Sequence, residues 1–310
     1  MEWTGRSVRC GVLLPFHAAY PGAAFGDITT AARHAEELGL DSVWVGDHLS
    51  TGNALLDGTV ALACAAGVTT RVKLGIAVMV PALRQLTWAA KQVASLQYIS
   101  NNRLQLGVGV GAVGGHPNEW DAAGVTSAGR AARTDQFLDA LPRLLAGAPT
   151  ELDSLPGRPT VKLDPPVGPP EIWIGGTSDA ALDRAATYGQ GWLSALLSPA
   201  QMVRPIARLV QLAATRGVPT PAAGTMIFAH LTEKTMADPA APVREFLINS
   251  YGVEPTQAAD ILVAGTPAQV AEQLAAYRAV GVTEFVIISF GPDLATQYQL
   301  TAQTRSILLD

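Results

Sequence analysis

Short runs rich in apolar and β-branched residues alternate with segments of helical periodicity along the whole chain. Eight such runs occur, and repeated β/α alternation of this kind is typical of a parallel sheet covered by helices. A closed barrel and an open doubly wound sheet both fit the alternation. Eight units within 310 residues favour an α/β fold of the (β/α)8 TIM-barrel type. The predicted strands are 8–16, 41–46, 72–80, 103–110, 171–175, 191–196, 224–230 and 283–290.

Composition agrees with one large folded unit, and we interpret residues 1–310 as a single domain. Hydrophobic residues make up 48% of the chain and charged residues 15%, which allows a large buried core. The net charge is −5 without a basic stretch, so a nucleic-acid partner is not expected. We recognise neither an apolar run of membrane-spanning length nor a signal core, and we expect no membrane partner and a cytoplasmic location.

Helix signals support the same periodic organisation. Asp27 can cap a first helix, and Gly39 can end it. The predicted buried face of that helix consists of Ile28, Ala31, Ala35 and Leu38. A second helix, over 85–100, should bury Ala89, Val93, Leu96 and Ile99.

Three stretches interrupt the repetition. They are 111–129, the proline-rich 148–170 and 231–265. We interpret 148–170 as an ordered surface connection because it has no helical period. Insertions on the C-terminal side of the strands usually build the specificity of a barrel, so the mouth of the barrel is where we expect these segments to matter.

The fourth strand is unusual for the core of a barrel. Leu104, Leu106 and Val108 alternate with glycines at 107, 109 and 111, so the bulky residues should face the helices and the glycines the barrel interior. The glycines would then leave space for a flat ring, or they would simply ease tight packing. The string Gly109–Gly114 also fits a dinucleotide-binding pattern, which we reject because Pro117 stands where the helix should begin.

The fifth strand passes directly into a helix through Gly175, Gly176, Thr177 and Ser178. Glycines allow close approach of the backbone, and a helix N-terminus offers N–H groups to an anion. This turn is either a cradle for a cofactor phosphate, with Arg184 as a helper, or an ordinary capped turn.

His48 follows Asp47 at the end of the second strand. Strand ends at the mouth of a barrel carry the catalytic groups, so His48 is our candidate for donating a proton or hydrogen bond, against the alternative of a structural histidine. The histidines show no metal-ligand spacing, and we find no serine-nucleophile motif and no P-loop. A metal site is therefore not predicted.

The chain resembles the luciferase-like flavin- and deazaflavin-dependent oxidoreductases, including bacterial luciferase, over nearly its full length. The resemblance rests on several motifs in the same order rather than on any one of them. The matching segments are 31–48, 71–81, 100–111, Glu119-Trp120 with Gly124, 169–182 and 265–287.

The resemblance implies a cofactor at the C-terminal mouth, either the deazaflavin coenzyme F-420 or FMN. It also implies a non-prolyl cis peptide near Ala77-Val78 behind the ring, and a position for His48 close to the reactive ring. We therefore assign the cofactor site to residues at the strand exits. These are Phe16, Ala77, Val78, Gly109, Gly111, Gly175, Gly176, Thr177 and Ser178.

Three motifs depart from the family pattern. Ala112 stands where deazaflavin-dependent sugar-phosphate dehydrogenases have a glutamate, which puts that acid role in doubt. Asn101-Asn102 replace a glycine pair, and asparagine tolerates the left-handed backbone that a turn can require. Gln190 replaces an aspartate of uncertain role.

Three functions remain open at this point. The first is hydride transfer with the reduced deazaflavin, as a reductase of imines or activated alkenes or as a dehydrogenase. The second is monooxygenation with O2 and reduced FMN from a separate flavin reductase, and the third is a flavin-binding homologue without catalysis. The substrate is expected to be an apolar organic molecule of secondary metabolism, contacted by Met79, Trp120 and Trp192. The apolar helices 57–69 and 85–100 suit a homodimer interface.

Overall fold

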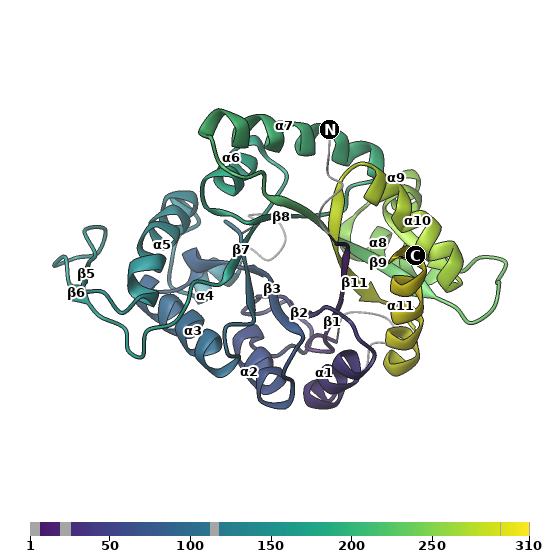
Figure 1. The fold of residues 1–310 in the computed structure, drawn as a ribbon, viewed down its shortest axis with the longest axis horizontal. Helices are drawn as coiled ribbons and strands as arrows, with labels where there is room; N and C mark the ends of the chain where they lie inside the picture. Colours follow the sequence, from purple (N-terminus) through teal and green to yellow (C-terminus); the bar gives the residue numbers. More distant parts are fainter. Residues whose placement is uncertain (1–6, 19–25, 112–117, 292, 310) are drawn as a thin grey trace.

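The computed structural model describes residues 7–18, 26–111, 118–291 and 293–309. Within these ranges a parallel sheet closes into a barrel surrounded by helices (Figure 1). The strand order is β10-β9-β11-β1-β2-β3-β4-β7-β8, and the pairing of β8 with β9 closes the barrel. The predicted TIM barrel is therefore confirmed, and the open sheet is excluded.

Each of the eight predicted strands is present, with bounds that differ from the prediction by a few residues. The barrel strands are β1 (Arg9–Leu13), β2 (Ser42–Val45), β3 (Lys73–Met79), β4 (Leu104–Val108), β7 (Glu171–Gly175), β8 (Gly191–Ala195), β9 (Ala222–Leu231) and β11 (Val282–Ser289). The helices are α1 (Ile28–Glu37), α2 (Gly58–Val68), α3 (Leu86–Ile99), α4 (Asn118–Ala122), α5 (Arg130–Leu145), α6 (Asp179–Tyr188), α7 (Pro199–Arg216), α8 (Ala241–Tyr251), α9 (Pro255–Ile261), α10 (Pro267–Ala279) and α11 (Leu294–Leu309), with a short 3-10 helix η1 (Pro81–Leu83).

The caps of α1 follow the prediction. The Asp27 carboxylate accepts hydrogen bonds from the backbone N–H groups of Thr29 and Thr30, and Gly39 takes a positive φ of 76° just after the helix. In α3 the prediction is wrong for Ile99, which is half exposed in the last turn of the helix.

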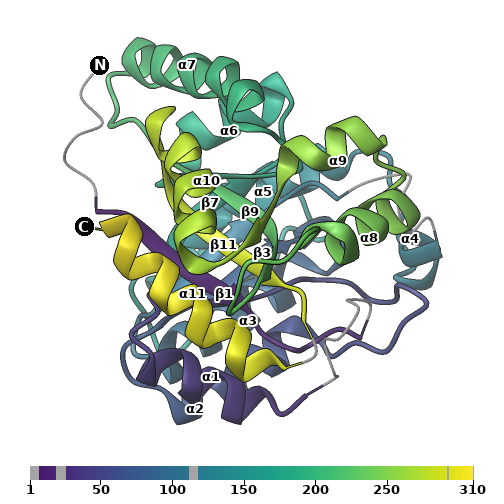
Figure 2. The same ribbon diagram turned by 90° about the vertical axis from the view of Figure 1, so that its right-hand side faces the viewer.

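The three interruptions lie at two different ends of the barrel. The stretch 231–265 forms α8, α9 and the extra strand β10 (Leu262–Gly265), and Figure 2 shows α4, α8 and α9 gathered at one end of the molecule. The stretch 148–170 instead follows α5 and forms a small hairpin of β5 (Thr150–Glu151) and β6 (Thr160–Val161). It precedes a barrel strand, so it lies at the N-terminal end and not at the mouth. Of the stretch 111–129, residues 112–117 lie outside the described residues, as does the end of the string Gly109–Gly114.

Two tryptophans fill the middle of the barrel, where glycines on neighbouring strands make room for them. A Cβ atom added at Gly75 would lie 2.0 Å from the ring of Trp44, and one at Gly191 would lie 2.3 Å from the ring of Trp173. Both rings are fully buried. The barrel is thus a packed core, and its chemistry is confined to the ends.

The floor of the barrel holds a charged network. The Arg9 guanidinium contacts Glu171 Oε1 at 2.7 Å and Glu284 Oε2 at 2.5 Å, and the Ser42 hydroxyl donates to Glu284 Oε1 at 3.3 Å. Burial, opposed by Arg9, raises the pKa of Glu284 to about 7. This network joins β1, β7 and β11 at the end away from the mouth. We therefore interpret it as a network that stabilises the fold and takes no part in catalysis.

Candidate active site at the barrel mouth

The exits of β2, β3, β4 and β7 meet at the mouth through a chain of contacts. At the exit of β3 the Ala77–Val78 peptide bond is cis, and the pairing of β3 with β4 shifts between Ile76 and Met79. The cis peptide expected from the resemblance is therefore present. It forms a bulge at which Ala77 and Val78 are only partly buried.

The glycines around this bulge make room for Val78. A Cβ atom added at Gly109 would lie 2.6 Å from Val78 Cγ2, and one at Gly175 would lie 2.9 Å from Val78 Cγ1. A Cβ at Gly107 would lie 2.0 Å from the backbone oxygen of Ile76. The glycines do face the barrel interior as predicted, but the space beside them is taken by the bulge. The expectation that they leave open space for a ring is therefore wrong, and the bulge itself presents the surface to a ligand.

Asp47 ties the exit of β2 to this bulge. Its Oδ2 accepts a hydrogen bond from the backbone N–H of Val80 at 2.8 Å and another from Arg84 Nη1 at 2.7 Å. Although burial works against the charge of Arg84, its hydrogen bond to Asp47 and the attraction of that carboxylate raise its pKa. Asp47 is consequently an anchor for the segment that follows the bulge.

His48, the next residue, turns toward α4. Its Nδ1 lies 3.3 Å from Oε2 of Glu119, while Oε1 of the same carboxylate accepts from the backbone N–H of Leu49 at 2.6 Å. The His48 side chain is 43% exposed and that of Glu119 only 10%. His48 is thus reachable from solvent and held by a buried acid. We gave Glu119 no role from the sequence, although it lies in a motif that carried the family resemblance.

His17, at the exit of β1, faces the same loop. Its Nε2 lies 2.8 Å from the Thr51 hydroxyl oxygen, and His17 pairs through its backbone with Leu55. Phe16 beside it is buried, and a Cβ at Gly46 would lie 2.9 Å from its ring. Both residues therefore hold the β2–α2 connection in place, and contact of Phe16 with a cofactor stays a prediction.

The turn between β7 and α6 is accessible. Residues 176–178 are exposed, and Gly176 has a φ of 111° that favours glycine. The Ser178 hydroxyl caps α6 by accepting from Ala181 N at 3.2 Å. The turn is therefore capped, as the plainer interpretation expected, and it also presents a helix N-terminus toward solvent.

Arg184 does not assist this turn. Its Nε and Nη2 donate to the two carboxylate oxygens of Asp135 at 2.6 and 3.1 Å. The guanidinium is thereby committed to joining α6 to α5. Asp179, in the first turn of α6, adds a negative charge that is 72% exposed.

The predicted substrate-contacting residues are all buried. Trp192 is fully buried, and its indole N–H donates to the carbonyl of Gly176 at 2.6 Å. Met79 is fully buried opposite Val108. Both side chains belong to the core, and their contact with a substrate stays a prediction. Their positions in the sequence indicate the strand on which each residue lies. They do not indicate the side of the barrel wall that the side chain faces, which depends on the pairing of Met79 with Val108 and of Trp192 with Ile174.

Trp120 is 5% exposed and packs with Val80 and Ala82 in a small cluster beside the mouth. A Cβ atom at Gly111, whose φ is 73°, would lie 2.9 Å from the Trp120 ring. Gly111 thus serves the packing of Trp120, which in turn sits one residue after Glu119. Contact of Trp120 or Gly111 with a ligand stays a prediction.

A largely buried aromatic cluster packs on the β9–β11 side of the same end, and the sequence analysis did not single it out. Phe228 of β9 and Phe290, after β11, lie near Phe246 of α8, with ring centroids of Phe246 and Phe290 5.1 Å apart. The half-exposed Tyr251 at the end of α8 packs edge-on against Phe228 and Phe246. Such a cluster is suited to apolar ligands.

The residues present fit a flavin-type cofactor. The partly exposed Ala77–Val78 bulge offers a surface for one face of a ring, and the exposed turn 176–178 offers close backbone approach and N–H groups for a phosphate. The carboxylate of Asp179 is the one feature of this turn that opposes an anion, and Arg204 lies 3.9 Å from it.

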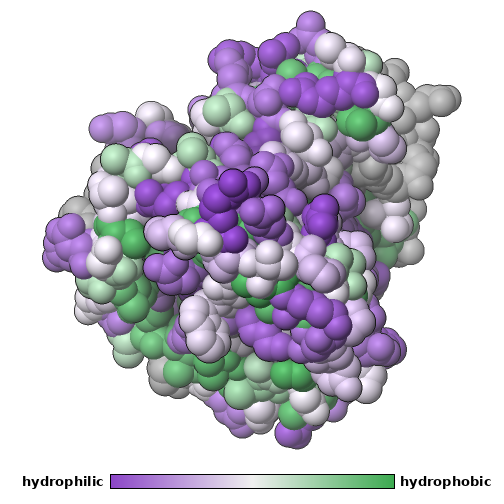
Figure 3. Space-filling view, turned by 90° about the vertical axis from the view of Figure 1, so that its left-hand side faces the viewer, coloured by the Kyte–Doolittle hydropathy of each residue, from purple (hydrophilic) through white to green (hydrophobic). Residues whose placement is uncertain are grey.

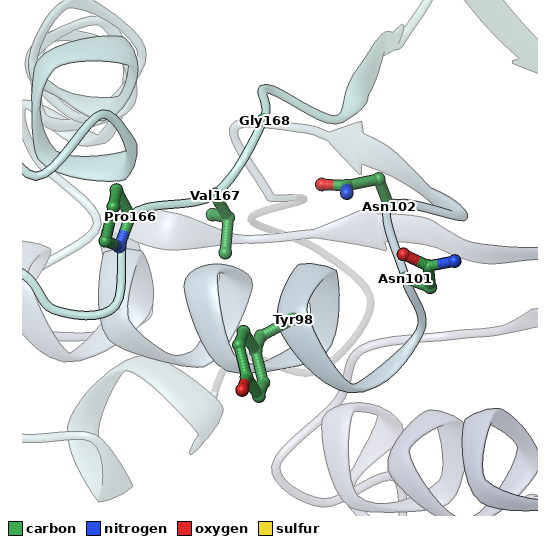
Figure 4. A pocket seen from close by; sticks show the side chains of 6 residues that line it. All are labelled: Tyr98, Asn101, Asn102, Pro166, Val167 and Gly168. Atoms are coloured by element: carbon green, nitrogen blue, oxygen red, sulfur yellow. The ribbon is translucent and has the colours of Figure 1, made fainter.

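A surface hollow of about 630 Å³ lies between the end of α3 and the segment Pro166–Gly168 (Figure 4). Asn101 and Asn102, which line it, precede β4, so this hollow belongs to the N-terminal end of the barrel. Among the described residues, no three His, Cys, Asp or Glu side chains gather as a metal site would require. In the same ranges, no helix is long and apolar enough to cross a membrane.

Two proteins are similar to parts of this chain in sequence. An uncharacterized protein of Mycobacterium tuberculosis is 32% identical over 172 residues, which is 55% of this chain and 58% of that protein. The 4-hydroxyprotoasukamycin monooxygenase of Streptomyces nodosus subsp. asukaensis is 29% identical over 128 residues, or 41% of this chain and 34% of that enzyme. The chain thus matches about half, or less, of the length of these relatives.

Among solved structures, an F420-dependent secondary alcohol dehydrogenase superposes with a TM-score of 0.82 at 15% identity, covering 98% of this chain and 99% of that one. This likeness establishes the fold. The model of one protein family, described as luciferase-like monooxygenase, matches residues 8–284. The chain therefore belongs to the luciferase-like monooxygenase family.

Proposed function

We propose that this protein is an oxidoreductase that uses the deazaflavin coenzyme F-420 to exchange a hydride with an organic substrate. It would act as a reductase of imines or activated alkenes, or in reverse as a dehydrogenase. The observation that carries the proposal is the placement of His48. Its ring lies beside the buried carboxylate of Glu119. The preceding residue, Asp47, anchors the segment that follows the Ala77–Val78 bulge. The likeness to an F420-dependent dehydrogenase over nearly the whole chain supports the choice of coenzyme.

Each part of the mouth would have a separate task. When bound, the reduced coenzyme supplies the hydride equivalent. The bulge would support one face of the ring, and the turn 176–178 would hold a phosphate at the N-terminus of α6. His48 would give a proton to, or take one from, a heteroatom or carbon of the substrate.

The substrate is proposed to be a medium-sized apolar molecule, for example an intermediate of secondary metabolism. Phe228, Phe246 and Phe290 are buried, and the half-exposed Tyr251, which packs edge-on against Phe228 and Phe246, would present the apolar surface of this cluster to the substrate. The Tyr251 ring would bury apolar surface of the substrate and keep water from the reacting atoms.

Binding of the coenzyme can be tested directly. The purified protein is titrated with F-420 and, separately, with FMN, in both redox states, and the fluorescence is followed. We expect selective, saturable binding of F-420. Selective binding of reduced FMN would replace the proposal with the second function below, and binding of neither would overturn both.

A second function is a two-component monooxygenase that receives reduced FMN from a separate flavin reductase. The similarity to 4-hydroxyprotoasukamycin monooxygenase favours it. Deazaflavin does not support activation of O2, so substrate-dependent O2 consumption distinguishes this function from hydride transfer. Tight binding of either cofactor without turnover of any substrate would indicate a flavin-binding protein without catalysis.

We further propose that two copies of the chain pair through α2 and α3. Val60 on α2 and Trp88 and Tyr98 on α3 are 60%, 71% and 65% exposed, and the two helices pack side by side. Figure 3 shows hydrophobic residues gathered in the lower part of the face seen there. An apolar patch of this kind on a folded domain is typical of a protein interface.

Substitution of exposed valines tests this interface. Val60→Glu should convert the dimer to a monomer in sedimentation velocity, because a charge would be buried between the copies. Val203→Glu is the matched control, since Val203 on α7 is 52% exposed on another side of the barrel. A wild-type monomer, or loss of the dimer in both variants, would contradict pairing through α2 and α3.

A further inference from the structure

The carboxylate of Glu119 connects two segments that arise from different strand exits. Glu119 lies on α4, after β4, while its partners lie in the loop between β2 and α2. Oε1 accepts hydrogen bonds from the backbone N–H groups of Leu49 at 2.6 Å and Ser50 at 3.2 Å. Oε2 lies 3.3 Å from His48 Nδ1.

The two oxygens of Glu119 therefore have different tasks. A buried carboxylate needs donors around it, and Oε1 finds them in two backbone N–H groups. An ionised carboxylate can only accept hydrogen bonds, so the ring nitrogen that faces Oε2 must carry a proton. The neutral His48 ring then has its proton on Nδ1 and its lone pair on Nε2.

We infer that Glu119 is the positioning residue of His48 and fixes the ring as the Nδ1–H tautomer. Proton exchange with the substrate then passes through Nε2, the nitrogen remote from Glu119. When the ring is protonated, Nε2 holds the transferable proton; when the ring is neutral, Nε2 is the base. The role in turnover rests on the proposed function, whereas the tautomer is a property of the protein alone.

The variant Glu119→Gln separates positioning from a merely structural role. A glutamine can keep its carbonyl oxygen on the Leu49 and Ser50 N–H groups, so the loop stays clamped. Its amide NH2 group would then face His48 and can only donate, so Nδ1 must become the acceptor and the proton must move to Nε2. Asp121→Asn, which changes an exposed carboxylate on the same helix, is the matched control.

The tautomer is measured by 15N NMR of histidine-labelled protein without cofactor. The His48 signals are identified by their loss in His48→Gln, and the tautomer is determined at the basic limit of a pH titration. We expect Nδ1–H in the wild type and in Asp121→Asn, and Nε2–H in Glu119→Gln. An Nε2–H ring in the wild type, or an Nδ1–H ring in a folded Glu119→Gln, would overturn the inference.

Kinetics provide the second readout once a substrate turns over. Glu119→Gln should lower kcat at least about tenfold with little change in KM, because the reactive nitrogen has the wrong protonation while the binding surface persists. Equal kcat in Glu119→Gln and wild type would overturn the role of Glu119 in turnover. Absence of cofactor binding would count against the proposed function while leaving the tautomer result intact.

Discussion

His48 is the residue at this mouth whose surroundings suit the proposed proton transfer. Its sequence position, directly after a barrel strand, identifies it as a candidate. The structure adds a partly exposed ring beside the buried carboxylate of Glu119. Exposure allows contact with a substrate, and the carboxylate orients the ring, so the pair has the arrangement expected of a proton donor.

Replacement of His48 tests this role. We expect His48→Ala to retain the fold, because the side chain is 43% exposed, and to lower kcat at least about tenfold through loss of the proton-transferring group. Thermal unfolding followed by circular dichroism checks the fold, and steady-state kinetics check the rate. An unchanged kcat would remove His48 from the mechanism.

At the scale of elements, the β3 bulge and its anchor organise the mouth. Asp47 accepts from the backbone of Val80 and from Arg84, and thereby holds the segment that follows Val78. A second aspartate, Asp41, makes similar contacts at the opposite end of the barrel, to Cys10 N and Arg305. The two carboxylates are alike in chemistry and differ in location.

This likeness provides a matched pair of variants. Asp47→Asn should weaken cofactor binding at least severalfold, because loss of the ion pair with Arg84 loosens the bulge. Asp41→Asn should lower the melting temperature without changing the dissociation constant of the cofactor. Equal effects of both variants on that constant would show that the bulge anchor has no special role in binding.

The eight strands and the barrel could be predicted because alternation, caps and glycines are local signals. Asp27 and Gly39 delimited α1 correctly, and Gly109 was placed on the interior face. The occupant of the space beside Gly109 could not be predicted, because it is Val78 from a neighbouring strand. Glu119 was likewise missed because its partner, His48, is 71 residues away in the chain. The complete burial of Met79 and Trp192 could not be predicted either, because it depends on pairing with neighbouring strands, with Val108 across the register shift of β3 and with Ile174 of β7.

At the scale of the whole molecule, closure of the barrel places a charged network at its floor. Arg9 links Glu171 and Glu284 from three strands of the closed sheet. Burial raises the pKa of Glu284 to about 7, against the attraction of Arg9. The folded protein thus holds a proton on this residue more tightly than the unfolded chain does.

The stability of the fold should therefore depend on pH in a definite direction. The pKa of Glu284 is raised on folding to about 7. The protonated carboxyl group therefore contributes fully to the free energy of unfolding when the pH is below the pKa of Glu284 in the unfolded chain. This contribution decreases as the pH rises toward the pKa of the folded state. Between about pH 5 and about pH 8, the unfolding free energy of the wild type should fall relative to Glu284→Gln by up to about 3 kcal/mol. Urea denaturation across this range measures both proteins, and parallel pH curves would contradict the assignment.

Binding of the cofactor against the Ala77–Val78 bulge at the barrel mouth is tested most directly by comparing two glycine variants with the wild type. The dissociation constant of F-420 is measured by fluorescence for the wild type, Gly109→Ala and Gly67→Ala. The two substitutions add the same methyl group, which at Gly109 would lie 2.6 Å from Val78 and at Gly67 would meet nothing within 4 Å. We expect Gly109→Ala to weaken binding about tenfold or more, equivalent to at least about 1.4 kcal/mol, and Gly67→Ala to bind as the wild type does. A folded Gly109→Ala protein with the wild-type dissociation constant would contradict binding against the bulge.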